Sequence, residues 1–173
     1  MTFTLYDATV VHAQTALRAM DHIITEGEKH PNSASFPQAR LYEDMKPLAF
    51  QVSAASFFTE RVLARLTGEE PAEFKGEVAS FADMHARIAH TQEALAKADK
   101  DTVNRKGEEV QTTDLPNIGV VDINGGAFAM GAVMPNLVFH VSIAYAILRK
   151  EGVPLGKLDF ITEFGKEYIL KTQ

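Results

Sequence analysis

The strongest constraint on the fold is the spacing of apolar residues, which recurs at helical intervals along most of the chain. The spacing predicts four long helices, at about Leu5 to Glu28, Leu41 to Leu66, Phe74 to Lys97 and Pro135 to Lys150. Each helix has one apolar face, and such faces are stable when they are buried against one another. The pattern therefore predicts an all-α fold, a four-helix bundle.

Residues that favour helix ends refine these boundaries. Pro47 lies inside the second stretch, so this helix either begins near Lys46 or kinks there. Thr67-Gly68 is a good C-terminal stop for the same helix, and Ser80 is a possible cap before Phe81. Pro135 suits the first turn of the fourth helix.

The segment from Ala98 to Met134 differs from the rest because it is rich in glycine and contains β-prone residues at Ile118 to Ile123. We expect it to form a long irregular connection between the third and fourth helices, for which a β-hairpin is one form. A further short helix is expected from Leu158 to Leu170. With no repeat or low-complexity segment, residues 1–173 are predicted to form one domain.

Composition excludes several classes of function. The net charge is −6, from 17 basic and 23 acidic residues, and the basic residues are scattered, which argues against a nucleic-acid partner. No run approaches the roughly 18 apolar residues that cross a bilayer, so no membrane partner is expected. The absence of cysteine excludes disulfides and thiolate ligands. The N-terminus has no signal-peptide pattern, and we expect a cytoplasmic protein.

A few polar residues fall on or beside the apolar faces when each helix is viewed down its axis. Asp44 and Gln51 lie on the core stripe of the second helix, His85 lies beside that of the third, and His140 borders that of the fourth. Burying such groups without partners costs about 1–3 kcal/mol each. We therefore expect them either to satisfy one another or to line a cavity inside the bundle.

The candidate catalytic residues are His140, as an acid/base group, with Asp44 and His85 beside it. The other interpretation is structural, with His85 as a hydrogen-bonded core residue and Asp44 as a helix-terminal charge. The candidate substrate-binding residues comprise one amide and several apolar or aromatic side chains: Gln51, Met45, Phe58, Phe81 and Tyr6.

The chain lacks the common motifs for nucleotides, zinc or serine nucleophiles, and we expect no cofactor and no metal. The residues favour a cofactor-independent enzyme that moves protons on a small, largely apolar substrate. An isomerase or cyclase acting on a phenolic or polyketide-like metabolite fits this pattern.

Several segments carry a resemblance to a known family. PNLVFHVSIAYAILRKEGVPLGKLDFI, Pro135 to Ile161, resembles the C-terminal signature of the DUF1993 family. Its second and third helices are resembled by LYEDMKPLAFQV, Leu41 to Val52, and FADMHARIAHT, Phe81 to Thr91. The N-terminal stretch TLYDATV fits the family too. The family is similar to the DinB/YfiT-like bundles, which implies the same fold here and a homodimer.

Many DinB-like proteins hold a divalent metal with three histidines, two of them four residues apart on the last helix. Here Asn136 and Ala144 stand four residues on either side of His140, and Gln51 stands where a histidine is wanted. The resemblance therefore does not carry over the metal. Two alternatives to the isomerase remain open: a DinB-like metal-dependent transferase or hydrolase, and a non-catalytic dimeric module that binds a small molecule.

Overall fold

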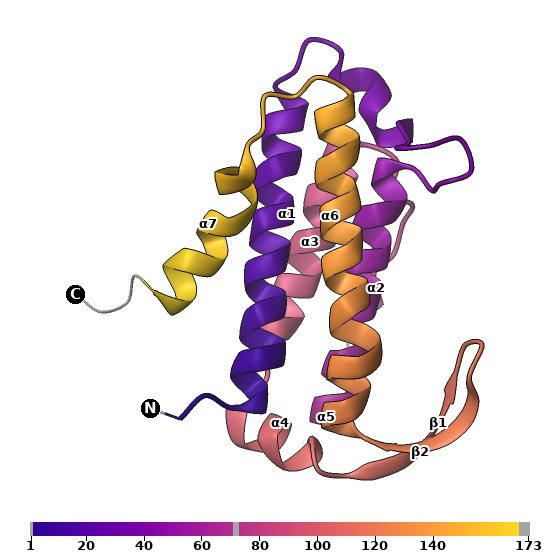
Figure 1. Ribbon diagram of the computed structural model, residues 1–173, viewed down its shortest axis with the longest axis vertical. Helices are drawn as coiled ribbons and strands as arrows, with labels where there is room; N and C mark the ends of the chain where they lie inside the picture. Colours follow the sequence, from indigo (N-terminus) through magenta and orange to yellow (C-terminus); the bar gives the residue numbers. More distant parts are fainter. Residues whose placement is uncertain (1, 71–72, 170–173) are drawn as a thin grey trace.

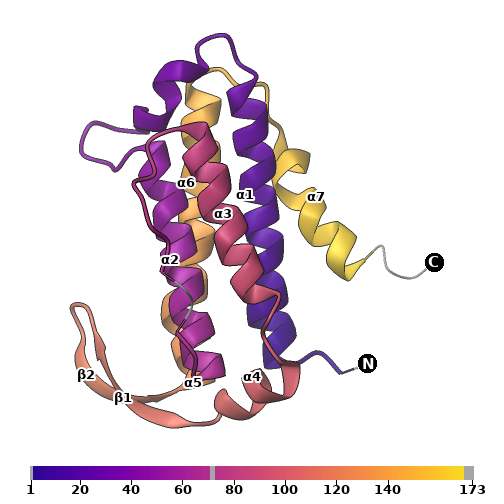
Figure 2. The same ribbon diagram turned by 180° about the vertical axis from the view of Figure 1, so that it is seen from behind.

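Four long helices form the predicted bundle in the computed structural model, which describes residues 2–70 and 73–169. They are α1 (His12–Glu28), α2 (Leu48–Thr67), α3 (Phe81–Leu95) and α6 (Met134–Lys150). Figures 1 and 2 show them side by side along the long axis, with α6 between α1 and α2 on one face and α3 behind. The all-α bundle predicted from the apolar spacing is confirmed.

Local chemistry sets the helix ends. Pro47 is the N-cap of α2, so the helix starts after it and does not kink, and Gly68 ends it with φ of 80°. Ser80 and Asp83 form a reciprocal capping box at the start of α3. The third helix therefore begins at Phe81, and the prediction that it includes Phe74 was wrong.

The connection between α3 and α6 contains the suggested hairpin. Strands β1 (Val110–Leu115) and β2 (Gly119–Asn124) pair antiparallel, with Val110 opposite Asn124. Asn117 and Gly119 adopt positive φ at the turn. The ribbon projects from one end of the bundle (Figure 1). A short helix, α4 (Lys100–Lys106), precedes it and was not predicted.

Helical structure begins well before α6. The short helix α5 (Gly125–Phe128) and a π-helical turn, η3 (Ala129–Val133), run directly into it. The wider turn precedes Pro135, which has no N–H for a regular helical bond, and the Asn136 amide donates to the Ala132 carbonyl at 2.6 Å. Residues 125–150 are long and apolar enough to cross a membrane by length and composition. They also pack in the bundle core, as Leu137, Val141, Ala144 and Leu148 are fully buried.

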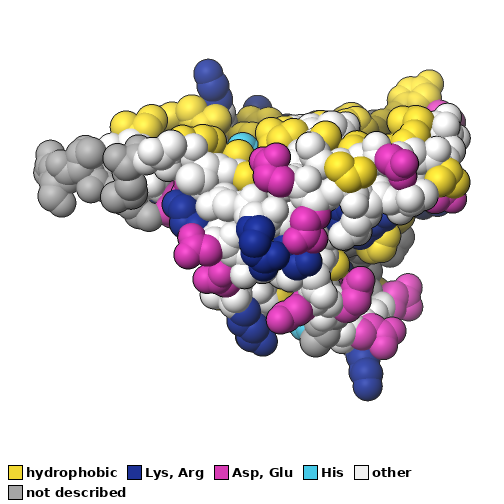
Figure 3. Space-filling model, turned by 90° about the horizontal axis from the view of Figure 1, so that it is seen from below, with side chains coloured by type: hydrophobic (Ala, Val, Ile, Leu, Met, Phe, Trp, Pro, Cys, Tyr) yellow, Lys and Arg dark blue, Asp and Glu magenta, His cyan; other side chains and the backbone are white. Residues whose placement is uncertain are grey.

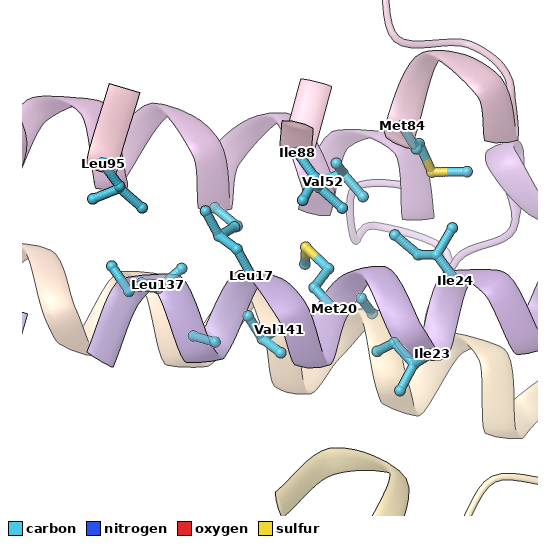
Figure 4. Packing of buried hydrophobic residues seen from close by; sticks show 14 of the residues in the cluster. Leu17, Met20, Ile23, Ile24, Val52, Met84, Ile88, Leu95, Leu137 and Val141 are labelled. Atoms are coloured by element: carbon cyan, nitrogen blue, oxygen red, sulfur yellow. The ribbon is translucent and has the colours of Figure 1, made fainter. Parts of the chain in front are cut away.

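The core runs the length of the bundle. Figure 4 shows Leu17, Met20 and Ile24 of α1 facing Val52, Met84, Ile88 and Leu95, with Leu137 and Val141 alongside. All of these side chains are at most 3% exposed. Tight packing of this kind fixes the rotation of each helix about its own axis, and so decides which polar residues face inward.

Three shorter elements complete the fold. A π-helical turn, η1 (Asp7–Val11), leads into α1, and a 3-10 helix, η2 (Ser33–Gln38), follows it. The tail helix α7 (Lys157–Tyr168) packs against α1, with Arg18 paired to Glu163 and Glu167. Leu170, predicted as the end of this helix, lies outside the described residues.

Candidate functional site

His140 lies where α6 packs on α2, and a chain of hydrogen bonds fixes its ring. Its Nδ1 is 2.8 Å from Oε1 of Gln51. The Gln51 amide nitrogen donates to the Lys46 carbonyl at 2.8 Å, just before the start of α2. Gln51 is 2% exposed and His140 is 9% exposed. The two polar residues that the sequence placed on the core faces of these helices therefore meet.

The direction of these hydrogen bonds determines the tautomer of the neutral His140 ring. Because the Gln51 nitrogen is used by the Lys46 carbonyl, the Gln51 oxygen faces the imidazole, and this oxygen only accepts. Nδ1 of His140 must then carry the hydrogen. Nε2 is the basic nitrogen, and no residue in the described ranges forms a hydrogen bond with it.

Aromatic rings surround the imidazole. The Phe58 ring stacks on it at a centroid distance of 5.6 Å and an interplanar angle of 17°. Phe50 and Phe139 meet it edge-on, at 6.1 and 5.3 Å. Burial lowers the pKa of His140 below its ordinary value of 6.5, because an imidazolium is poorly solvated here. His140 is therefore neutral at pH 7 and presents a free base.

A pocket of about 460 Å³ opens beside His140, between α2 and α6. Its lining is mostly aromatic and aliphatic, and comprises Phe50, Ser53, Ala54, Phe57, Phe58, Asn136 and His140. Phe50 and Phe57 are 42% and 51% exposed, so the pocket is open to solvent at its rim. An apolar site with one oriented basic nitrogen suits a small aromatic ligand that carries a weakly acidic hydrogen.

Asp44 does not belong to this site, which corrects the sequence prediction. The helical face that placed Asp44 inward assumed a helix from Leu41, but α2 begins only at Leu48. Asp44 lies in the preceding turn and is exposed to solvent. Because Asp44 lies outside α2, the helical period does not determine where its side chain points.

His85 is the second correction. Its Nδ1 lies 2.6 Å from Asp21 Oδ1 on α1, and its Nε2 lies 3.6 Å from Glu28 Oε2. This half-exposed cluster bridges α1 and α3, whereas His140 lies between α2 and α6. His85 therefore stabilises the contact between two helices and does not face the pocket.

Three predicted substrate contacts also lie elsewhere. Met45 is in the loop before α2, where its carbonyl accepts a bond from Arg40. Phe81 is 8% exposed and packs near Gly27 of α1. The Tyr6 ring lies beneath the ammonium group of Lys100. Of the predicted aromatic contacts only Phe58 lines the pocket.

Phe50, Phe57 and Asn136 line the pocket but were not predicted from the sequence. Phe57 is half exposed. Phe50 and Phe57 are seven residues apart on α2, off the stripe of Leu48, Ala55 and Val62. That second apolar row was the available signal, because apolar residues that gather in one patch on the outer face of a helix often mark a binding surface.

The residues around His140 do not fit a metal ion. The donors nearest to its ring are amides, from Gln51 and Asn136, and the Gln51 oxygen is already used by Nδ1. Within residues 2–70 and 73–169 no group of three or more His, Asp or Glu side chains is placed to hold one. A transition-metal site ordinarily needs three good protein ligands, so the donor set is unsuitable.

Comparisons with known proteins agree with this architecture. The crystal structure of a DinB family member protein from Shewanella denitrificans superposes with a TM-score of 0.79. It is 28% identical to this chain, and the match covers 91% of each. No curated protein matches. The model of a domain of unknown function, DUF1993, matches residues 5–161, which is most of the chain. The chain therefore belongs to the DUF1993 family.

Proposed function

We propose that the protein binds a small aromatic metabolite in the pocket between α2 and α6 and moves a proton on it through His140. The observation that carries this proposal is the free Nε2 of a buried, neutral imidazole whose tautomer is set by Gln51. The DinB-like fold supports a small-molecule-binding or enzymatic protein in general terms. The finer assignment, an isomerase or cyclase acting on a phenolic or polyketide-like compound, is our proposal.

The proposed step needs no redox partner. Nε2 removes a proton from an acidic C–H or O–H bond, and the electron pair stays on the substrate as an enolate or phenolate. The imidazolium then returns the proton to another atom of the same molecule, which completes an isomerisation. Gln51 keeps accepting from Nδ1 in both states. Because burial disfavours a lasting imidazolium, proton return is favoured once the anion has formed.

Replacing His140 by Gln is expected to lower turnover at least 100-fold, the typical contribution of a positioned acid/base group. The measurement is the rate at which compounds in a panel of small phenols and enolisable ketones convert to isomers of equal mass, followed by mass spectrometry. Its pH profile should fall on the acid side, below the ordinary pKa of 6.5, because protonated Nε2 cannot act as a base. The matched control is His22→Gln, a partly exposed histidine paired with Asp159. Equal rates for wild type and His140→Gln contradict the proposal.

A second candidate function, a non-catalytic dimeric binding module, is favoured by the apolar surface beside the pocket. Figure 3 shows hydrophobic side chains gathered along one edge of the molecule, the side on which α6 lies, while charged side chains gather on the opposite part. Five large apolar residues at α2 and the η3–α6 run are 37–52% exposed: Phe50, Phe57, Met130, Val138 and Phe139. We call this set the apolar face.

A second copy of this chain is the partner that we propose for the apolar face. Half-exposed side chains of this size leave on the order of 500 Å² of apolar area, which is most of the roughly 800 Å² that each partner buries in a standard interface. No charged residue lies between Met134 and Leu148, so two copies of α6 can meet without burying unpaired charges.

Replacing Met130 or Val138 by Glu is expected to weaken such a dimer at least 10-fold, because each change buries a charge in the contact. Sedimentation equilibrium measures the association directly. The control is Leu158→Glu on α7, a residue that is 71% exposed and lies outside the apolar face. A wild-type protein that sediments as a 19.0 kDa monomer at all concentrations contradicts the dimer.

A further inference from the structure

We infer that Arg61 binds an anionic group of the ligand, so that the substrate class is an aromatic carboxylate. This inference rests on the proposed function of the His140 pocket and deepens it. Within the described ranges, each of the other six arginines donates a hydrogen bond or forms an ion pair, and Arg61 does neither.

The position of the Arg61 guanidinium is nevertheless defined. Its Cζ lies 5.8 Å from the ring centres of both Phe57 and Phe128, and the side chain is half-buried. Two aromatic faces hold the group by cation–π attraction and leave its N–H donors unused. A guanidinium that is already held in place by two aromatic rings binds a planar anion with two parallel hydrogen bonds and little loss of side-chain entropy.

A pocket of about 390 Å³ lies against Arg61, between α2, the hairpin turn and the start of α6. It is lined by Phe58, Arg61, Phe128 and Asn136, together with turn residues such as Pro116 and Ile118. Phe58 and Asn136 also line the His140 pocket. The two pockets are therefore adjacent, with Phe58 between them.

The spacing on α2 sets the size of a ligand that reaches both groups. Phe58 and Arg61 are one turn apart, a rise of about 4.5 Å along the axis. The centroid of the imidazole lies 5.6 Å from that of the Phe58 ring. A ligand of about two fused or linked rings spans this distance, with its acidic hydrogen at Nε2 and its anion at Arg61.

The charge of the two pocket linings favours a carboxylate over a phosphate. Arg61 is the only cationic side chain among the residues that line either pocket. A single guanidinium matches the one negative charge and two oxygens of a carboxylate. A doubly charged phosphate ordinarily requires a second cation or a helix N-terminus, and a net charge of −6 gives it no long-range attraction. Glu60, Glu70 and Glu73 line another pocket with Arg61, and they repel a doubly charged anion more strongly than a singly charged one.

Isothermal titration with 2-naphthoate and 2-naphthamide tests the inference, since these probes share the ring system and differ in charge. Arg61→Gln is expected to weaken 2-naphthoate binding about 10-fold or more, the usual effect of losing a hydrogen bond to a charged group, and to change 2-naphthamide binding less than twofold. Arg61→Lys should recover part of the loss. The control is Arg105→Gln, an exposed arginine on α4.

Each outcome separates this inference from the proposed function. Equal effects of Arg61→Gln on both probes, or no effect on either, overturn the carboxylate assignment even if His140→Gln abolishes turnover. A selective loss of 2-naphthoate binding supports it even if His140→Gln leaves turnover unchanged, in which case only the proton-transfer proposal fails. Failure of wild type to bind either probe overturns the inference.

Discussion

Replacing Arg87 by Met is expected to lower the free energy of unfolding by about 3 kcal/mol. Arg87 of α3 donates to both carboxylate oxygens of Glu60 on α2, at 2.5 and 2.7 Å. Thr91 donates to the same carboxylate at 3.0 Å. The Arg87 side chain is 8% exposed and that of Glu60 is 17% exposed, so removing Arg87 leaves a nearly buried charge unpaired. For a domain of this size the melting temperature should fall roughly 6–12 °C.

The double variant Glu60→Leu/Arg87→Met supplies the matched control. It removes both charges, and a buried ion pair replaced by apolar residues is often close to neutral. We expect it to recover most of the lost stability in thermal and urea denaturation. If the double variant is as unstable as Arg87→Met alone, the loss comes from packing and not from the unpaired carboxylate.

Replacing Gln51 by Glu is expected to raise the pKa of His140 above its wild-type value, because a carboxylate then faces Nδ1–H and stabilises the imidazolium. In the wild type, burial holds this pKa below 6.5. Titration of the ring protons by NMR measures both values. Long-range ¹H–¹⁵N spectra of the wild type should show hydrogen on Nδ1 and a bare Nε2 above pH 7.

Gln51→Leu is the matched control for this substitution, since it removes the hydrogen-bond acceptor without adding charge. It should release the ring from the Nδ1–H tautomer and leave the pKa low. A His140 pKa that is the same in wild type and Gln51→Glu contradicts the orientation derived from Lys46 and Gln51.

The lowered pKa of His140 also sets how its contribution to stability depends on pH. The unfolded chain binds the proton near pH 6.5, whereas the folded protein binds it only at lower pH. The contribution of neutral His140 is therefore complete above about pH 6.5 and is lost as the pH falls through the folded-state pKa. Gln51→Glu should reduce this loss on the acid side, because it raises the folded-state pKa of His140 toward the unfolded value.

Much of the bundle was predictable because apolar residues recur at helical spacing along each helix that packs in the core. The apolar faces of α1, α2, α3 and α6 recur at helical spacing, and burial of Leu17, Ala55, Ile88 and Val141 confirms their phase. Gln51 and His140 lie on or beside those faces, so their inward position followed from the same period. That they meet at 2.8 Å required the packing of α2 on α6.

The incorrect predictions for Asp44 and His85 have the same physical cause. Asp44 was placed by extending a helix through Pro47, and the proline ends that pattern. His85 lies beside the correct stripe, but the pairing of α3 with α1 brings it to Asp21 and not to His140. A helical period gives the direction of a side chain relative to its own helix and carries no information about which neighbour lies there.

By itself, the sequence determined an all-α chain, the faces of its helices and the hairpin segment before the last of them, because these depend on interactions within a few residues. Only the tertiary structure decided that Phe58 joins two pockets, and that neither Nε2 of His140 nor the Arg61 guanidinium has a hydrogen-bond partner among residues 2–70 and 73–169. These features depend on how α2, α6 and the hairpin meet, across as many as 89 residues of sequence for the Gln51–His140 contact. Contacts between residues so far apart in the sequence depend on the packing of the whole core, and a local sequence pattern does not predict them.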